Sequence, residues 1–343
     1  MNKKLLALAV AGAMAAPLAA QAEVTIYGVA HVSVDALDND VSGENEVDGL
    51  FVSSNSSRIG FKGSEDLGGG LKAIWQIESG VDLDERGGEF ATRNSFVGLA
   101  GGFGAVIAGR HDTPFKIIGR KVDLFADQIG DAQNLTSVGG AADEAAGWDL
   151  RADNVVAYIS PSFNGLQAIV AYVAEDGGED TDAYSLNLTY SNGPLFLGAA
   201  YEQHNEGLVG GDDEETGFRL AASYEMGAFK VTGLYQNLSD VGGVSGDDAD
   251  VWGLGAAYSF GNNVLKAQYY SADSDVAGDA DMWAIGLDHN FSKSTTAYIA
   301  YAETDNDNNA RFNVAAGGHG DNFGDAGVGK NPSGFSIGLI HKF

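Results

Sequence analysis

The 343-residue sequence contains no cysteine, only five prolines and few basic residues. Without cysteine the chain can form neither disulfides nor a thiolate metal site. Nineteen lysines and arginines stand against 48 acidic residues, and the formal net charge of −29 excludes nucleic-acid binding through a basic surface. No stretch after residue 22 is apolar over the roughly 20 residues that a membrane-spanning helix needs. The sequence therefore predicts no transmembrane helix.

The first 22 residues have the three parts of a secretory signal peptide. Lys3 and Lys4 form a basic start, residues 5–16 are apolar, and Ala20-Gln-Ala22 matches the small-x-small cleavage pattern. The apolar run is too short to span a membrane as a helix. We therefore expect residues 1–22 to be a cleaved signal peptide and residues 23–343 to form one exported domain.

Alternation between large apolar residues and small or polar ones recurs along residues 23–343. It is clear in residues 183–190, 252–260 and 283–291, where aromatic residues also stand at both ends of the apolar face. Such ends are typical of strands that cross both membrane–water interfaces. A soluble β-sandwich also alternates, but it gives no reason for aromatic residues at both strand ends. The 49 glycines suit a curved wall around an open lumen.

Short turns and long polar loops alternate between these strands. The seven predicted turns lie at 67–70, 101–102, 162–165, 191–193, 225–227, 261–263 and 292–294. The eight predicted loops lie at 38–55, 82–91, 112–150, 175–181, 203–214, 239–248, 272–279 and 305–331. Fifteen connections join sixteen strands, an even number that fits bacterial barrels. The sequence therefore predicts an all-β fold, a 16-stranded antiparallel transmembrane β-barrel, wide enough to hold an aqueous channel.

In the last nine residues, 335–343, large side chains alternate with mostly small or polar ones, and the stretch ends at the aromatic residue Phe343. This end resembles the final strand of bacterial outer-membrane proteins, and the resemblance implies that Phe343 is an assembly signal for the barrel-assembly machinery. We expect Phe343 to lie near Glu23, where the barrel closes. An ordinary edge strand is the alternative.

Several basic residues are candidates for the pore lining. Alternation along residues 58–63 places Arg58 and Lys62 inward, opposite to Ile59 and Phe61. An arginine that faces lipid at mid-membrane is strongly disfavoured, so the arginines of the other strands should also face the lumen. The candidates for a basic wall are Arg58, Lys62, Arg93, Arg110 and Arg151. Some of them could instead be interfacial anchors or ion-pair partners at a subunit contact, and this alternative is strongest for Arg110.

The third long loop, 112–150, carries apolar residues that a solvated loop would not need, and it is therefore expected to fold inward. It also carries Asp123, Asp127 and Asp131, which would share one face of a short helix. Carboxylates on this loop opposite arginines on the wall would create a transverse field across a narrow opening. A solvated acidic helix face is the alternative.

Five motifs occur in order along the chain: Thr25–Gly28, Arg58–Gly63 followed by Glu65–Gly68, Gly70–Ala73, Arg93–Leu99 and Gly109-Arg110. Together they resemble the Gram-negative general diffusion porins, and the neisserial branch in particular. The resemblance implies a homotrimer of barrels in the outer membrane, each with its own pore narrowed by the third loop. Arg58, Arg93 and Arg151 match the family's basic wall positions. The enteric Pro-Glu-Phe-Gly-Gly loop motif is absent, and Val29 stands where enteric relatives carry a lumenal lysine.

Outward faces with small residues should form the subunit contact: Gly28, Ala30, Gly63, Gly98 and Ala100. The expected function is passive transport of small hydrophilic solutes and ions. Acid-rich outer loops such as 212–215, 247–250 and 279–281 favour a weak cation preference at low salt. A substrate-selective channel and a barrel enzyme are the alternatives, although the scattered histidines suit neither a catalytic site nor a metal site. We expect no cofactor, and we expect contact with outer-membrane lipid and lipopolysaccharide.

Overall fold

Antiparallel β-strands make up most of the chain that the structure describes. The computed structural model describes residues 23–43, 45–85, 90–138, 147–174, 181–209, 213–320 and 326–343. The signal peptide predicted over residues 1–22 lies outside this set and stays a prediction. The short helices are α2 (Pro114–Gly119), α3 (Gln133–Thr136) and α4 (Glu206–Val209). Within the described residues, no helix has the length and apolarity needed to cross a membrane.

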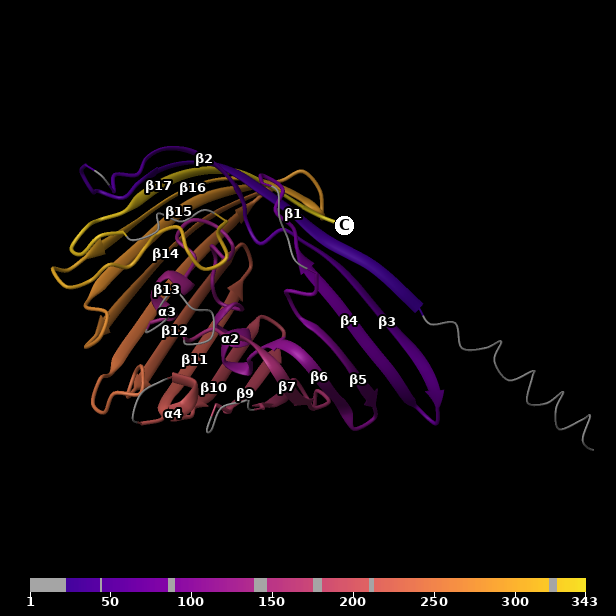
Figure 1. Cartoon of the computed structure of the whole chain (residues 1–343). Coiled ribbons are helices and arrows are strands. Elements are labelled where there is room, and N and C mark those ends of the chain that lie inside the picture. Colours follow the sequence, from indigo (N-terminus) through magenta and orange to yellow (C-terminus); the bar gives the residue numbers. More distant parts are fainter. Residues whose placement is uncertain are drawn as a thin grey trace, which may run out of the picture.

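The strands follow one another around a ring (Figure 1). They are β1 (Glu23–Asp38), β2 (Asp48–Ser54), β3 (Arg58–Gly68), β4 (Leu71–Gly80), β5 (Ser95–Gly101), β6 (Gly104–Asp112), β7 (Arg151–Ile159), β8 (Leu166–Val173), β9 (Ala183–Asn192), β10 (Leu195–His204), β11 (Glu215–Met226), β12 (Phe229–Ser239), β13 (Ala249–Phe260), β14 (Asn263–Ser274), β15 (Ala280–Asn290), β16 (Thr295–Asn306) and β17 (Ser333–Lys342).

The ring contains sixteen barrel strands, as predicted. Residues 32–38 of β1 pair with β2 and residues 23–29 of β1 pair with β3. Consequently β2 and β3 are two parts of one barrel strand, interrupted at residues 55–57. The other side of β1 pairs with β17, which closes the sheet. A closed sheet leaves no edge whose backbone groups would be unpaired.

The outer face of the barrel carries large apolar side chains that are exposed. On β13, Trp252 is 44% exposed, Leu254 61% and Tyr258 40%, whereas the alternate residues Gly253 and Ala257 are buried. Aromatic pairs mark the two ends of this face. The ring centres of Trp252 and Tyr269 are 5.3 Å apart at one end, and those of Tyr258 and Phe229 are 4.7 Å apart at the other. This arrangement fits a hydrocarbon layer bounded by two interfaces.

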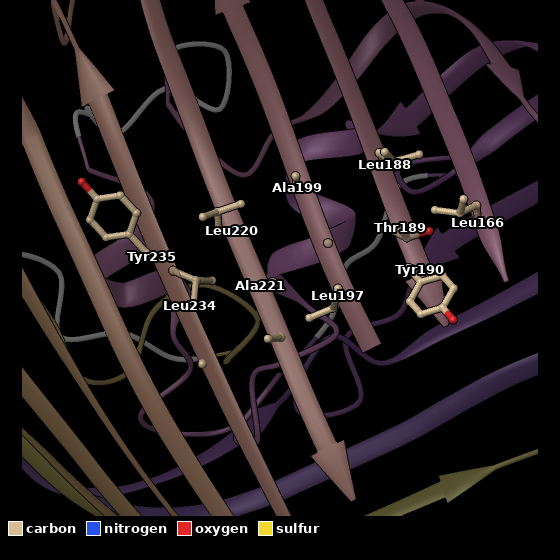
Figure 2. Close-up of a pocket in the computed structure, with 13 residues that line it drawn as sticks. Leu166, Leu188, Thr189, Tyr190, Leu197, Ala199, Leu220, Ala221, Leu234 and Tyr235 are labelled. Atoms are coloured by element: carbon tan, nitrogen blue, oxygen red, sulfur yellow. The ribbon is translucent and has the colours of Figure 1, made fainter. Parts of the chain in front are cut away.

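Figure 2 shows part of this apolar face over β8–β12. A shallow groove runs between the side chains of Leu188, Leu197 and Leu220 because the small residues Ala199, Ala222 and Gly233 lie between the larger ones. The lining is almost entirely apolar. Like the rest of the outer face, it is suited to contact with lipid chains.

Short and long connections alternate around the ring in the predicted order. One boundary prediction was wrong. The first long loop covers residues 39–47 rather than 38–55, because residues 48–54 form β2 and extend the pairing with β1.

The chain end pairs at the seam of the barrel, but not where it was expected. Phe343 N donates to Gly28 O at 3.1 Å and Gly28 N donates to Phe343 O at 2.9 Å. A Cβ atom at Gly28 would lie 2.4 Å from the Phe343 ring. The seam therefore ends at Gly28, not near Glu23, because residues 23–27 pair only with β3 and extend past the last strand.

Small residues were predicted to face outward on three strands. The prediction was correct for β1 and β3 and wrong for β5. A Cβ atom at Gly28 would meet the ring of Phe343, and one at Gly63 would meet that of Trp75, so both glycines lie on the outer face. On β5, however, Val97 and Leu99 are the exposed residues. Gly98 and Ala100 point inward, where Gly98 pairs with buried Ile107.

Deletion of Phe343 is expected to block assembly of the barrel. The deletion removes the ring that covers Gly28 and two backbone hydrogen bonds at the seam. Folded protein in the outer membrane can be measured by its heat-dependent mobility on gels, and most of it should be lost. Lys342→Ala is the control, because the bond from Lys342 N to Ser294 O uses only the backbone. Normal amounts of folded truncated protein would show that Phe343 is no assembly signal.

Candidate pore constriction

The described parts of the third long loop, residues 113–138 and 147–150, lie inside the barrel, as predicted (Figure 1). Phe115, Ile118 and Val122 are at most 1% exposed and pack against the inner faces of β10–β15. Phe125 and Ile129 are fully buried against β15 and β16. Full burial of such a side chain contributes about 1.5–3 kcal/mol. The loop is therefore fixed to one side of the lumen, and the opening lies on the side of β3–β7.

Glycines in the wall make room for the loop. A Cβ atom at Gly217 would lie 2.3 Å from the Trp148 ring, and one at Gly255 would lie 2.9 Å from Leu124. The high glycine content thus serves close packing of the loop as well as an open lumen.

A buried arginine joins the two ends of the loop to the wall. Arg219 of β11 is fully buried, and its Nη1 lies 2.5 Å from Asp149 Oδ1. Nη1 also donates to Phe115 O at 3.2 Å, and the guanidinium carbon lies 4.0 Å from the centre of the Phe115 ring. Thr136 Oγ1 donates to Asp149 Oδ2 at 2.7 Å. Sequence reasoning missed this pair, because alternation can place Arg219 inside but cannot identify its partner.

The three loop aspartates do not share a helix face. Residues 120–132 form successive turns, and Asp127 has a φ of +62°. Both Asp127 and Asp131 bind Arg120, at 2.5 Å and 2.8 Å. The segment therefore curls around Arg120, a residue that the sequence analysis did not single out.

Only one of these aspartates faces the opening. Asp123 accepts hydrogen bonds from the backbone N–H groups of Phe125 and Ala132, and Asp131 is fully buried. Asp127 is 18% exposed and lies 3.8 Å from Arg58 on the wall. Asp123 and Asp131 thus hold the loop together, and Asp127 is the carboxylate that faces the wall arginine Arg58.

Neighbouring charges control the ionisation of these loop aspartates. Burial alone would raise the pKa of Asp127, but Arg120 and Arg58 outweigh burial and hold it below its usual range. Burial raises the pKa of Asp123, and the charge of Asp131 raises it further. Asp127 is therefore ionised at neutral pH, whereas Asp123 holds its proton more strongly than an ordinary carboxyl group.

The wall opposite the loop carries the predicted arginines. Arg58 Nη1 donates to Ser56 O at 2.7 Å, which fixes the guanidinium near the loop tip. Arg93 Nε donates to Glu78 Oε1 at 2.7 Å, and Tyr27 OH donates to Glu78 Oε2 at 2.8 Å. Glu78 was not among the candidates from the sequence, and it is the acceptor that orients Arg93.

The remaining basic residues lie at the root of the loop and further down the wall. Arg151 Nε lies 3.0 Å from Asp112 Oδ1, and Lys116 Nζ lies 3.8 Å from the same oxygen. Lys62 lies on the inner face of β3, with its Nζ 5.0 Å from the centre of the Tyr27 ring. The structure thus brings Arg58, Arg93 and Arg151 to one side of the opening.

Arg110 does not belong to this group, and its placement in the pore was wrong. It pairs in register with Ser95 of β5, on the same face as outward-facing Val97. Its Nη1 lies 2.7 Å from Asp153, whose side chain is 64% exposed. This location agrees with the alternative role as an ion-pair residue on the outer face.

Asp149→Ala should loosen the third loop. The substitution leaves the buried guanidinium of Arg219 without its carboxylate, a change that typically costs about 3–5 kcal/mol. We expect a lower temperature of barrel unfolding and noisier single-channel currents. Asp153→Ala, which removes the exposed partner of Arg110, is the control and should change neither property. An unchanged unfolding temperature in the Asp149 variant would contradict this account of the loop.

Comparison with known proteins agrees with this architecture. A family model described as Gram-negative porin matches residues 7–309. The major outer membrane protein P.IB of Neisseria meningitidis is 30% identical over 321 residues, which cover 88% of this chain and 92% of that protein. Outer membrane porin protein 32 of Delftia acidovorans is 32% identical over 361 residues and covers both chains completely.

Solved structures show the same fold. A structure described as an anion-selective porin from Comamonas acidovorans has a TM-score of 0.81 at 28% identity, covering 94% of this chain and all of that one. The trimer form of OmpT from Vibrio cholerae has a TM-score of 0.68 at 16% identity, covering 94% of this chain and 99% of that one, a likeness of fold alone. The chain therefore belongs to the Gram-negative porin family, a family of outer-membrane channel proteins.

Proposed function

We propose that this porin is a passive, water-filled channel for small hydrophilic solutes and ions, and that its constriction favours anions. The observation that carries the proposal is the charge balance around the opening. Five cationic side chains meet four carboxylates in the ion pairs described above. Lys62 adds a further cation on the same wall. Anions passing the constriction therefore meet an excess of positive charge at close range.

The exposure of these groups adds to the imbalance. Asp131 is fully buried beside Arg120, whereas the side chain of Arg120 is 26% exposed and that of Arg58 is 24% exposed. A buried carboxylate neutralises its partner but offers little to a passing cation. The charges that solutes can approach are consequently more positive than the count of pairs implies.

Three carboxylates of the acid-rich outer loops lie on the outer face or are buried, and these three do not line the mouth of the pore. Asp250 accepts a hydrogen bond from Tyr235 and Asp281 accepts one from Tyr269, both on the outer face of the barrel. Glu215 is buried, with Oε1 2.6 Å from His204 Nδ1. The comparisons lend no support to the cation preference expected from these loops, and a 28% identical structure is described as anion-selective.

Reversal potentials in a salt gradient test the proposal. The purified protein in planar bilayers should prefer anions, and Arg58→Ser combined with Arg93→Ser should shift the preference toward cations. Asp127→Asn should shift it further toward anions. An ion about 4 Å from one charge in water gains about 1 kcal/mol, so each substitution should change the permeability ratio severalfold.

Arg110→Ser is the matched control for these arginine substitutions, because Arg110 lies on the outer face. It should leave the reversal potential unchanged. A cation preference in the unsubstituted protein, or equal effects of Arg58→Ser and Arg110→Ser, would contradict the proposed anion preference.

We also propose that three copies associate through the small outer faces of β1 and β3. Gly28, Ala30 and Gly63 lie on these faces, where small side chains permit close contact between barrels. The Vibrio relative has been described in a trimer form. Contacts with lipopolysaccharide and with the barrel-assembly machinery remain predictions.

Ala30→Trp should weaken this association. The ring would occupy the space that a neighbouring barrel needs, without changing the backbone pairing of β1. Unheated protein in mild detergent should then migrate as a monomer, whereas Ala199→Trp, placed on the outer face of β10, should leave the trimer intact. A stable Ala30→Trp trimer would place the subunit contact elsewhere.

A further inference from the structure

The interruption between β2 and β3, residues 55–57, forms a binding site for another segment in the barrel wall. At residues 55–57 the chain leaves the regular pairing with β1, and Ser56 has a φ of +48°. Ser57 Oγ accepts a hydrogen bond from His31 N and donates one to His31 O, each at 2.9 Å. Asn55 N also donates to His31 O at 2.9 Å. The interruption is therefore held in a defined shape, and the side chains of Asn55 and Ser56 bind another segment of the chain.

Residues 318–320 of the last long loop bind at this interruption. Ser56 Oγ donates to Gly318 O at 2.9 Å, and Gly320 N donates to Asn55 Oδ1 at 2.9 Å. A Cβ atom at Gly320 would lie 2.5 Å from Ser54 O, so the two backbones are in direct contact. Between these two glycines, His319 Nε2 lies 3.2 Å from Asp35 Oδ2, and both side chains are fully buried.

The same loop holds the tip of the third loop. Gly130 N donates to Val314 O at 2.8 Å, and Asn134 Nδ2 donates to the same oxygen at 3.3 Å. A Cβ atom at Gly318 would lie 2.1 Å from Asp127 Oδ1 and 3.0 Å from Asp127 Cα. Residues 314–320 therefore lie between the barrel wall and the third loop, in contact with both.

Both members of the pair at the constriction depend on this junction. Ser56 O accepts the hydrogen bond from Arg58 Nη1, and Ser56 Oγ binds Gly318, which lies against Asp127. We propose that residues 314–320 form a clamp that positions Asp127 against Arg58. The last loop then sets the width and charge of the constriction, together with the third loop. This inference rests on the proposed function in one respect, since it takes the Arg58–Asp127 region as the narrow part of the pore.

Gly318→Ala tests the clamp directly. Its φ is not in the left-handed region, so the added methyl group acts through the contact with Asp127 rather than through backbone strain. The tip of the third loop must move away from Arg58, which raises single-channel conductance and shifts the reversal potential toward anions. Gly49→Ala is the matched control, because a Cβ atom there has its nearest neighbour at 3.6 Å. The control should match the unsubstituted protein in both measurements.

A double-mutant cycle separates positioning from general loosening. Asp127→Ala removes the side-chain atom nearest to the new methyl group, so Gly318→Ala should shift the reversal potential much less in that background than alone. Ser56→Ala, which removes the hydroxyl donor without adding bulk, should shift conductance in the same direction as Gly318→Ala. Equal shifts from Gly318→Ala with and without Asp127 would overturn the clamp, as would unchanged currents in both Gly318→Ala and Ser56→Ala.

These experiments distinguish failure of the clamp from failure of the proposed anion preference. If Arg58→Ser leaves the reversal potential unchanged, the anion preference is wrong, yet a conductance change in Gly318→Ala would still show that the clamp controls pore width. If Arg58→Ser acts as expected and the clamp variants do nothing, only the clamp is wrong. Heat-dependent gel mobility checks that each variant forms a folded barrel before currents are compared.

Discussion

Backbone hydrogen bonding in hydrocarbon is the constraint on which the rest of this structure depends. No water is present there to satisfy N–H and C=O groups, so every strand must pair on both sides. The chain meets this requirement by pairing β17 with β1 and by pairing the terminal Phe343 with Gly28. Where β2 and β3 separate, Ser57 Oγ bonds to both backbone groups of His31, and Asn55 N also donates to His31 O. Closure of the ring thus depends on β1, which pairs with β17 on one side and with both β2 and β3 on the other.

A closed ring of sixteen strands encloses more space than wall side chains can fill. The third loop occupies part of that space because its apolar side chains gain free energy on burial, and wall glycines such as Gly217 and Gly255 admit them. The buried Arg219–Asp149 pair then fixes the loop against β11. The result is an asymmetric lumen, with an apolar contact on the β10–β16 side and a charged opening on the β3–β7 side.

Period-two alternation allowed most of the fold to be predicted, because a strand between lipid and water has two chemically different faces. It failed on β5 and β6, where both faces are apolar. Phe96 and Ile107 point inward and pack together with Val155, whereas Val97 and Val106 face lipid. Gly98 and Arg110 were therefore assigned to the wrong side. Polarity cannot decide such a strand, and its orientation follows from pairing with β4 and β7, which sequence alone does not reveal.

The site shows a second limit of sequence reasoning. The wall arginines Arg58 and Arg93 were identified because an arginine that faces lipid at mid-membrane is strongly disfavoured. Arg110, near the end of β6, shows that this rule does not extend to strand ends. The loop aspartates carried no such restriction, and their spacing suggested a helix that does not form. Their roles follow from Arg120, which binds Asp127 and Asp131 and leaves Asp127 facing Arg58. The separation of 3.8 Å between Asp127 and Arg58 is longer than a tight ion pair, whereas Asp127 is paired with Arg120 at 2.5 Å, so the charge of Arg58 is the less neutralised of the two. Carboxylates that hold the loop and the carboxylate that faces Arg58 are thus distinguished by burial and partners, and the anion preference proposed above depends on that distinction rather than on the total charge of the chain.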